Sequence, residues 1–187
     1  MHTIELSIII VAYKAQKELE ACLTSIYRNK LNVSFEVIVV DNNKYSIQRK
    51  LKKYPKIKYI KSESNIGYSA ANNLGFVNSL GTYILILNPD TLIRPDSVSK
   101  LYLYLQKRPE IAIVSPALIN ENDDIYVQIG SGKLDQYVGV ISLSFINKIW
   151  KNNPISKKYF LREADHSIPL SVEVVPGSAL MIKRDVF

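Results

Sequence analysis

The sequence predicts an α/β fold: a doubly wound, Rossmann-like and mostly parallel sheet flanked by helices. Apolar runs of strand length recur along the chain, and stretches with helical spacing of apolar residues separate them. Helical crossovers of this length join parallel strands with right-handed connections, which places helices on both faces of the sheet. A chain of 187 residues with 47% apolar content is long enough for one domain with a buried core.

The first part of the chain alternates strands and helices. Ile4–Ala12 is rich in isoleucine and predicts a buried strand. Apolar residues then recur at i, i+3, i+4, i+7 and i+8, which is one face of a helix over 15–29; they are Leu19, Cys22, Leu23, Ile26 and Tyr27. There follow a predicted strand at Phe35–Val40, a short basic helix at Tyr45–Tyr54 that Pro55 stops, and a strand at Ile57–Ile60.

The alternation continues to residue 114. Ser69 is a candidate cap for a helix that runs to about Leu80, with Gly81 just past its end. Tyr83–Leu87 predicts the fourth strand and Ile111–Val114 the fifth. Between them, Pro95 suits the first turn of a helix whose inner face carries Val98, Leu101, Tyr102 and Leu105.

The regular alternation breaks after Pro116. We assign 1–187 to a single domain in which 120–170 is a variable insert, and this insert contains the apolar segment Val138–Trp150. Short strand-like pieces at Val172–Val175 and Ala179–Ile182 flank Pro176 and Gly177.

Composition narrows the class of protein. The net charge of +7 permits nucleic acid, anionic lipid or phosphorylated ligands as partners, but no nucleic-acid-binding module pattern is present in the sequence. The two histidines are too isolated for a metal site, and G-x-G-x-x-G, P-loop and G-x-S-x-G motifs are absent from the sequence. No apolar run reaches the roughly 18–20 residues that a membrane span needs. The single cysteine, Cys22, indicates a core residue in a reducing, cytoplasmic compartment.

Polar residues follow four of the predicted strands. Ligands bind beyond the carboxyl ends of parallel strands, so these residues form a candidate site. The four exits are Ala12-Tyr13-Lys14, Asp41-Asn42-Asn43, Asn65-Ile66-Gly67-Tyr68 and Asn88-Pro89-Asp90-Thr91. Asp41 suits the imide N–H of uracil or thymine, and Asp90 suits a Mg²⁺ or Mn²⁺ that bridges diphosphate oxygens. Each exit, taken alone, is also ordinary turn chemistry, and that alternative stays open.

The ordered set of motifs resembles the family-2 glycosyltransferases of the GT-A fold, especially their rhamnosyltransferase-like branch. The motifs that carry the resemblance include Val39-Val40-Asp41-Asn42-Asn43, Ala70-Ala71-Asn72-Asn73-Leu74-Gly75 and Val175-Pro176-Gly177-Ser178-Ala179-Leu180-Met181-Ile182. The resemblance implies nucleotide binding by Ala12, Tyr13, Asp41, Asn65, Gly67, Asn72 and Asn88. It implies a divalent metal, Mg²⁺ or Mn²⁺, on Asp90, and a donor and acceptor floor made by Gly177, Ser178 and Ala179.

The resemblance also has departures. Lys14 stands where asparagine is commoner in the family, and Lys44 stands where serine is common. In the family, a glycine-rich turn and an acidic motif with the catalytic base follow the last matched segment. We therefore expect the base beyond Phe187, and the chain to be a truncated form or fragment.

The resemblance implies an enzyme that transfers a sugar, with inversion, from a UDP- or dTDP-sugar to a glycan or lipid-linked acceptor in cell-surface polysaccharide synthesis. The alternative is a nucleotide-sugar-binding or scaffolding module without catalysis. Val138–Trp150 would face a missing C-terminal part or the inner face of the membrane, because basic residues follow its apolar side chains; otherwise it packs on the domain's own sheet.

Overall fold

The computed structural model describes residues 3–54, 56–120, 122–125, 130–142, 145–150 and 153–187. The chain divides into two compact units. The first, unit 1, comprises residues 1–114 and 177–187, and the second, unit 2, comprises residues 115–176. The predicted variable insert, 120–170, lies within unit 2.

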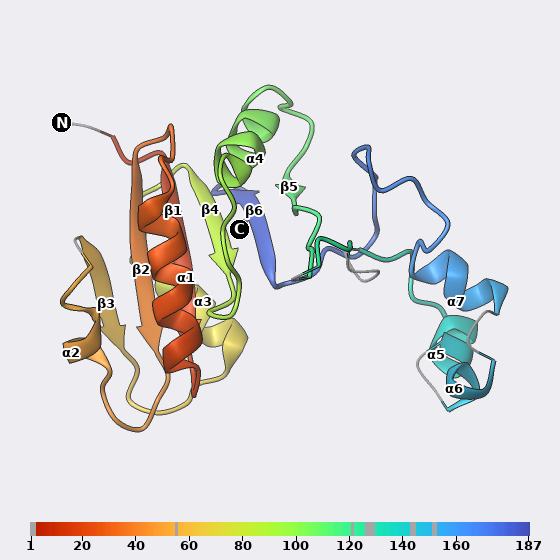
Figure 1. The fold of residues 1–187 in the computed structure, drawn as a ribbon, viewed down its shortest axis with the longest axis horizontal. Coiled ribbons are helices and arrows are strands. Elements are labelled where there is room, and N and C mark those ends of the chain that lie inside the picture. The colour runs from red at the N-terminus through yellow and green to blue at the C-terminus, as the bar shows by residue number, and fades with distance from the viewer. Residues whose placement is uncertain (1–2, 55, 121, 126–129, 143–144, 151–152) are drawn as a thin grey trace. The chain divides into compact units, whose positions relative to one another are not determined.

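Unit 1 contains a six-stranded sheet with the order β3-β2-β1-β4-β6-β5 (Figure 1). The strands are β1 (Leu6–Ala12), β2 (Phe35–Asp41), β3 (Ile57–Lys61), β4 (Tyr83–Leu87), β5 (Ile113–Val114) and β6 (Ala179–Lys183). The first four strands pair in parallel, while β6 lies antiparallel between β4 and β5. The predicted mostly parallel α/β sheet is therefore confirmed.

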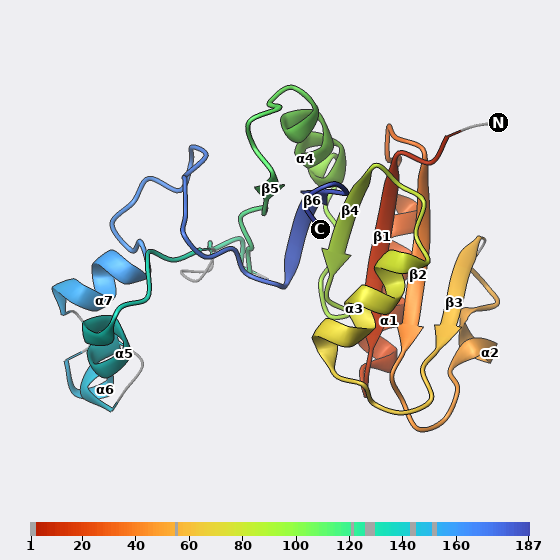
Figure 2. The ribbon, with the colours of Figure 1, turned by 180° about the vertical axis from the view of Figure 1, so that it is seen from behind.

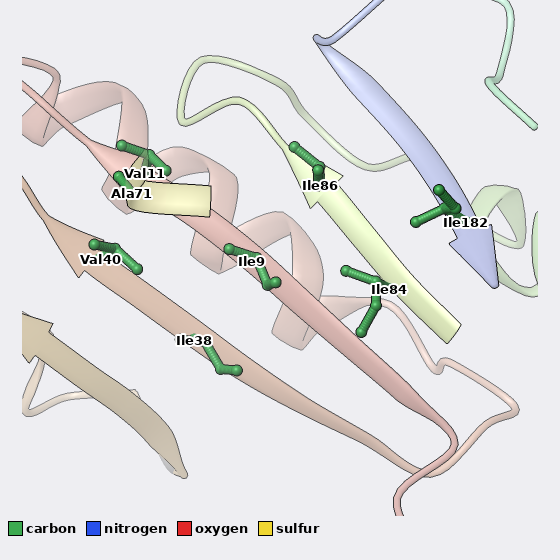
Figure 3. Packing of buried hydrophobic residues seen from close by; sticks show 8 residues of the cluster. All are labelled: Ile9, Val11, Ile38, Val40, Ala71, Ile84, Ile86 and Ile182. Atoms are coloured by element: carbon green, nitrogen blue, oxygen red, sulfur yellow. The ribbon is translucent and has the colours of Figure 1, made fainter. Parts of the chain in front are cut away.

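The core lies on both faces of this sheet. Every residue of β1 is buried, as expected for a central strand that helices cover on two sides. On one face, isoleucines and valines of β1, β2, β4 and β6 pack with Ala71 of α3 (Tyr68–Val77), as Figure 3 shows. α1 (Gln16–Arg28) covers the opposite face, as Figures 1 and 2 show from the two sides. Full burial of each such aliphatic side chain stabilises the fold by about 1.5–3 kcal/mol.

Two helices differ from their predicted limits. α2 spans only Gln48–Leu51, because the backbone N–H of Ile47 donates to the Asp41 carboxylate and the preceding residues form a loop. α3 begins at Tyr68 with Gly67 as its cap, so the predicted Ser69 cap is wrong: Gly67 takes φ +84° and Ser69 already lies inside the first turn. α3 ends at Val77, before the predicted Leu80, because the Asn78 side chain donates to the Leu74 carbonyl.

α4 spans Ser97–Gln106 and buries Val98, Tyr102 and Leu105, three of the four residues predicted for its inner face. Leu101 is only half-buried, and Ser99 is buried in addition. Pro95 precedes the helix, and Asp96 caps it with φ +61°. The strand predicted at Ile111–Val114 is limited to Ile113–Val114.

Unit 2 is mainly helical in its described residues, with α5 (Gln136–Ser142), α6 (Ile146–Ile149) and α7 (Pro154–Tyr159). α5 packs against both α6 and α7, and the Asn153 side chain caps α7 by accepting from the Ser156 N–H. The strand predicted at Val172–Val175 is reduced to one bridge between Val174 and Ser131. No helix among the described residues is both long and apolar enough to cross a membrane.

Candidate nucleotide-binding site

The carboxyl ends of the parallel strands meet at one side of the sheet in unit 1. Ala12 lies opposite Asp41, and Asp41 lies opposite Lys61 in the register. Because β6 is antiparallel, its first residue, Ala179, lies beside Leu87 at the same side. We call this region the carboxyl edge: residues 12–14, 41–43, 62–68, 88–91 and 177–179. The predicted site residues at the strand exits are therefore brought together.

Asp41 is buried at the end of β2, and its carboxylate is fully hydrogen-bonded. One oxygen accepts from the backbone and side-chain N–H groups of Asn43 at 2.9 and 2.8 Å. The other accepts from the Ile47 backbone at 3.1 Å and from the Tyr59 hydroxyl at 2.6 Å. Burial acts to raise the pKa of the Asp41 carboxyl, but the hydrogen bonds from Tyr59, Asn43 and Ile47 outweigh it and lower the pKa.

Asn43 links Asp41 to the exit of β1. Its side-chain amide donates to the Ala12 carbonyl at 3.1 Å and accepts from the Lys14 backbone N–H at 2.7 Å. Lys14 takes φ +54°, which is uncommon for a residue with a side chain. The Ala12 side chain is buried, so its backbone carries its contacts, whereas Tyr13 is exposed with the Lys14 ammonium 5.1 Å from its ring centroid.

The turn before α3 brings further predicted residues to the carboxyl edge. The Asn65 side chain accepts from the Gly67 backbone N–H at 3.1 Å, and the Gly67 carbonyl accepts from the Asn42 side chain at 3.2 Å. Gly67 combines φ +84° with ψ 169°, a conformation essentially restricted to glycine. Apart from Gly67 itself and its two neighbours in the chain, no described atom lies within 4 Å of the position that a Cβ on Gly67 would take, so the space beside this turn is open.

Asn72 is buried one helical turn after Tyr68. Its amide N–H donates to the Tyr68 carbonyl at 3.1 Å. Its side-chain oxygen has no hydrogen-bond partner within the described part of the chain. A buried acceptor without a partner costs free energy, which favours a donor from a ligand or water at this position.

The exit of β4 and the start of β6 are hydrogen-bonded to each other. The Asn88 N–H donates to the Ser178 carbonyl at 2.8 Å, and the Thr91 hydroxyl donates to the same carbonyl at 3.5 Å. The Tyr68 hydroxyl lies 2.8 Å from the Gly177 carbonyl and 3.1 Å from the Asn88 side-chain oxygen. The predicted floor residues therefore adjoin the predicted metal-binding loop.

Asp90 is exposed in this loop, and across the residues described no hydrogen bond or ion pair engages its carboxylate. Burial raises the pKa of the Tyr68 hydroxyl; a hydrogen bond with the Asn72 side chain lowers it, and the negative charge of Asp90 raises it. No group of three or more His, Cys, Asp or Glu residues suited to a metal occurs in the described ranges. A lone free carboxylate fits Mg²⁺ or Mn²⁺, since Mg²⁺ commonly takes one or two protein carboxylates and completes its shell with phosphate oxygens and water.

Cys22 lies behind the same loop, with its sulfur 3.8 Å from the Asn88 carbonyl. Burial, together with the charge of Asp90, raises the pKa of the Cys22 thiol to about 12. The thiol therefore stays protonated at neutral pH and acts as a small core residue, as the sequence predicts.

Similarity to known proteins identifies the protein family of this chain. Residues 7–187 match the family described as glycosyl transferase family 2. The chain belongs to this family. The low-salt glycan biosynthesis hexosyltransferase Agl10 of Haloferax volcanii is 28% identical over 187 residues, which is 98% of this chain and 54% of Agl10. Glycosyltransferase GlyA of Streptococcus pneumoniae is 25% identical over 162 residues, which is 83% of this chain and 22% of GlyA.

Solved structures establish the fold of this family-2 glycosyltransferase domain as GT-A. S. aureus TarS in complex with UDP-GlcNAc aligns over 67% of this chain and 38% of its own, with a TM-score of 0.58 and 17% identity. The mannosyltransferase PcManGT of Pyrobaculum calidifontis, in complex with GDP-Man and Mn²⁺, aligns over 66% of this chain and 38% of its own, with a TM-score of 0.56 and 19% identity. The chain spans about half or less of the relatives and structures named here.

The hydroxyl contacts of two tyrosines at the site were not predicted from the sequence. Tyr59 belongs to β3 and donates to Asp41, 18 residues away in the sequence. Tyr68 follows the Asn65-Ile66-Gly67 turn, but nothing in the sequence connects its hydroxyl with Gly177, 109 residues later. The sequence placed Tyr68 at a strand exit, as the last residue of Asn65-Ile66-Gly67-Tyr68, but did not indicate what its hydroxyl contacts.

Proposed function

We propose that this domain binds a pyrimidine-diphosphate sugar, UDP- or dTDP-linked, at the carboxyl edge, for inverting transfer of the sugar to a glycan or lipid-linked acceptor. The observation that carries the proposal is the free Asp90 carboxylate beside a cluster of uncharged donors and acceptors at the strand ends. Family membership supplies the reaction class, and the named sugar ligands of TarS and PcManGT are consistent with such a donor.

In this proposal the base lies at the exits of β1 and β2. The exposed ring of Tyr13 offers a stacking surface, and the backbone of Ala12 lines the pocket. Asp41 either accepts a hydrogen bond from the imide N–H of the base in place of one of its present donors, or holds Asn43 in position to contact the base. In either case, Asp41→Ala should weaken uridine or thymidine nucleotide binding by about 1–3 kcal/mol, as expected for a charge-assisted hydrogen bond. Unchanged affinity would restrict Asp41 to a turn role.

The ribose and diphosphate then extend along the turn before α3 toward the exit of β4. Gly67 allows close backbone approach, while Asn65 and the partnerless oxygen of Asn72 are available to ligand hydroxyl groups. Asn88 adjoins the diphosphate, and Asp90 holds the divalent metal. When bound, that metal neutralises charge on the departing diphosphate. Gly177, Ser178 and Ala179 form the floor under the donor sugar and the acceptor.

We also propose that the domain belongs to a hexosyl- or rhamnosyltransferase that contributes to bacterial cell-surface polysaccharide. The rival function is a nucleotide-sugar-binding or scaffolding module. Incubating the protein with UDP-hexoses, dTDP-rhamnose and candidate acceptors and measuring nucleotide release separates the two: binding without acceptor-dependent release supports the module.

We further propose that the protein works at the cytoplasmic face of the membrane, where lipid-linked acceptors lie. In unit 2 the exposed apolar residues Tyr137, Val140, Phe145, Ile149 and Trp150 form what we call the apolar set. Phe145 is 70% and Trp150 is 55% exposed. Lys148 and Lys158 are also solvent-accessible, and aromatic residues beside basic ones suit the interface of an anionic bilayer.

Calorimetric titration tests the donor-binding function. We expect UDP or dTDP to bind wild-type protein, Mn²⁺ to strengthen that binding, and Asp90→Ala to remove the strengthening. Asp185→Ala is the matched control, because Asp185 is an exposed carboxylate beyond the far end of β6. GDP provides a purine comparison. Equal affinity with and without Mn²⁺ overturns the metal role, and failure of all three nucleotides to bind overturns the function.

A further inference from the structure

One hydroxyl joins three separate segments of the carboxyl edge. The Tyr68 hydroxyl, on the first residue of α3, lies 2.8 Å from the carbonyl oxygen of Gly177 and 3.1 Å from the side-chain oxygen of Asn88. Its single proton is therefore directed at two acceptors, one on the turn before β6 and one on the loop after β4. The proposed function assigns these segments to the sugar floor and the metal loop, but it gives Tyr68 no role.

The loop that carries Asp90 has few other attachments. The Asn88 N–H and the Thr91 hydroxyl both bond the Ser178 carbonyl, and the Thr91 N–H closes the loop on the Asn88 carbonyl at 3.2 Å. These bonds fix the loop to the start of β6, and the Cys22 sulfur of α1 contacts the Asn88 carbonyl, but none of these contacts reaches α3. Within the described part of the chain, the Tyr68 hydroxyl is the one hydrogen-bond partner that joins the Asn88 side chain to α3.

Accordingly, we propose that Tyr68 is a positioning residue, whose hydroxyl sets the Asn88–Asp90 loop and the Gly177 turn at a fixed distance from α3. The inference rests on the proposed function, because it assigns Tyr68 to the metal-dependent part of donor binding. A carboxylate that must meet both a metal ion and diphosphate oxygens has to be held in place, and small displacements weaken such a site. Tyr68 acts through Asn88 and Gly177 and need not touch the metal.

If Tyr68 is a positioning residue, Tyr68→Phe should affect the metal-dependent part of nucleotide binding and leave binding of the base unchanged. The ring is kept and only the hydroxyl is lost, so the change acts on the two hydrogen bonds. Mn²⁺ should raise the affinity of the wild-type protein for UDP or dTDP by a certain factor. Loss of hydrogen bonds of ordinary strength should make that factor about three- to tenfold smaller in Tyr68→Phe. Binding of uridine or thymidine, which lack phosphates, should stay at the wild-type value, because the base lies at the other end of the carboxyl edge.

Tyr102→Phe is the matched control. Its hydroxyl donates to the Glu5 side chain at 2.6 Å. Glu5 directly precedes β1, so this contact lies at the amino-terminal end of that strand, away from the carboxyl edge. The substitution removes the same chemical group from a packed tyrosine. Substituting a tyrosine with a purely structural role should lower thermal stability but leave the Mn²⁺ dependence of nucleotide binding unchanged. We expect that result for Tyr102→Phe.

Isothermal titration of wild type, Tyr68→Phe and Tyr102→Phe with UDP and dTDP, with and without Mn²⁺, and with uridine and thymidine, decides the matter. A loss of Mn²⁺ enhancement confined to Tyr68→Phe supports the inference. Wild-type enhancement in Tyr68→Phe overturns it, as does an equal loss in Tyr102→Phe. If wild type itself binds no nucleotide diphosphate, the proposed function fails instead, so the two failures are distinguishable.

Discussion

At the scale of single residues, the Asp41 carboxylate organises the base end of the carboxyl edge. Its acceptor positions are taken by two groups of Asn43, one of Ile47 and one of Tyr59. The Tyr59 hydroxyl also bonds Ser46 at 2.7 Å, so the loop between β2 and α2 is held from both sides. A buried carboxylate with this many donors is stable only while it is ionised.

This arrangement predicts a pH-dependent effect of Asp41→Asn. Because the folded pKa of Asp41 lies below its value of 3.8 in the unfolded chain, its contribution is present above that value and is lost as the pH falls through the folded pKa. At pH 7 we expect the Asp41→Asn substitution to lower the free energy of unfolding by about 1–3 kcal/mol, since an amide N–H cannot accept the same bonds. Urea unfolding from pH 7 down to pH 2 should show the difference narrowing below about pH 4. An undiminished difference at pH 2 would contradict this.

The sequence located the residues of this site better than it located their partners. Asp41, Asn88 and Asp90 were identifiable because polar residues directly after apolar strands gather at one side of a parallel sheet. The roles of the Tyr59 and Tyr68 hydroxyls were not identifiable, because their contacts depend on the pairing of β2 with β3 and of β6 with β4. Local sequence carries no record of either contact.

At the scale of elements, Gly75 is the point at which α3 packs against Ile9 of β1 with no room for a side chain. A Cβ on Gly75 would lie 2.5 Å from Cγ2 of Ile9 and 3.4 Å from Cγ2 of Val40. Since Ile9 and Val40 both belong to the buried cluster, neither side chain has free space to move into. Gly75 thus sets the distance between α3 and the sheet. It thereby also sets the position of Tyr68, the first residue of α3, at the carboxyl edge.

We therefore expect Gly75→Ala to destabilise the protein by about 1–3 kcal/mol, the usual cost of overpacking, even though alanine favours helix. Asn73→Ala is the control, because Asn73 is exposed on the same helix and its replacement should be neutral or slightly stabilising. Chemical unfolding of both variants tests the difference. Equal stability for Gly75→Ala and wild type would show that α3 can shift outward without cost.

The helices of unit 2 support a prediction about lipid binding. With the apolar set exposed and basic residues nearby, the protein should sediment with anionic vesicles at low salt and less well with neutral ones. The double variant Phe145→Ser, Trp150→Ser should reduce sedimentation severalfold. Val77→Ser is the control, because Val77 is similarly exposed but lies on α3 in unit 1.

Absence of wild-type protein from the pellet with anionic vesicles at low salt would exclude the membrane contact. Sedimentation that is indifferent to Phe145 and Trp150 would assign the contact to another surface. If sedimentation depends neither on the lipid composition nor on the double variant, but the protein self-associates through these residues, the apolar set is a protein interface instead.

At the scale of the whole molecule, the six-stranded sheet and the carboxyl edge are both complete within unit 1. The break in alternation after Pro116 predicted where regular structure would change, and unit 2 begins at Ser115. The sequence did not predict that β6 would insert between β4 and β5. Strand order reflects pairing between distant segments, and a short apolar run such as Ala179–Lys183 is compatible with many positions in a sheet.

This division predicts that residues 115–176 can be replaced. A flexible linker of about eight Gly and Ser residues spans at most about 29 Å, enough to return from β5 to the neighbouring β6. We expect the shortened protein to fold cooperatively, to keep the nucleotide affinity of the parent and to lose vesicle binding. Circular dichroism, titration with UDP or dTDP and co-sedimentation measure the three properties. Loss of the cooperative transition would show that unit 1 depends on unit 2.

The position of β6 also bears on how the protein is made. Until residues 179–183 have been synthesised, β4 has β1 on one side and an open edge on the other, and β5 has no strand to join. At the usual elongation rate of about 5–20 residues per second, the interval between completion of β4 and completion of β6 lasts roughly 5–20 seconds. During that interval the nascent chain exposes the unpaired backbone of an apolar strand, which is a template for association with other chains. The growing polypeptide is therefore expected to need chaperone protection mainly while residues 88–183 are being translated.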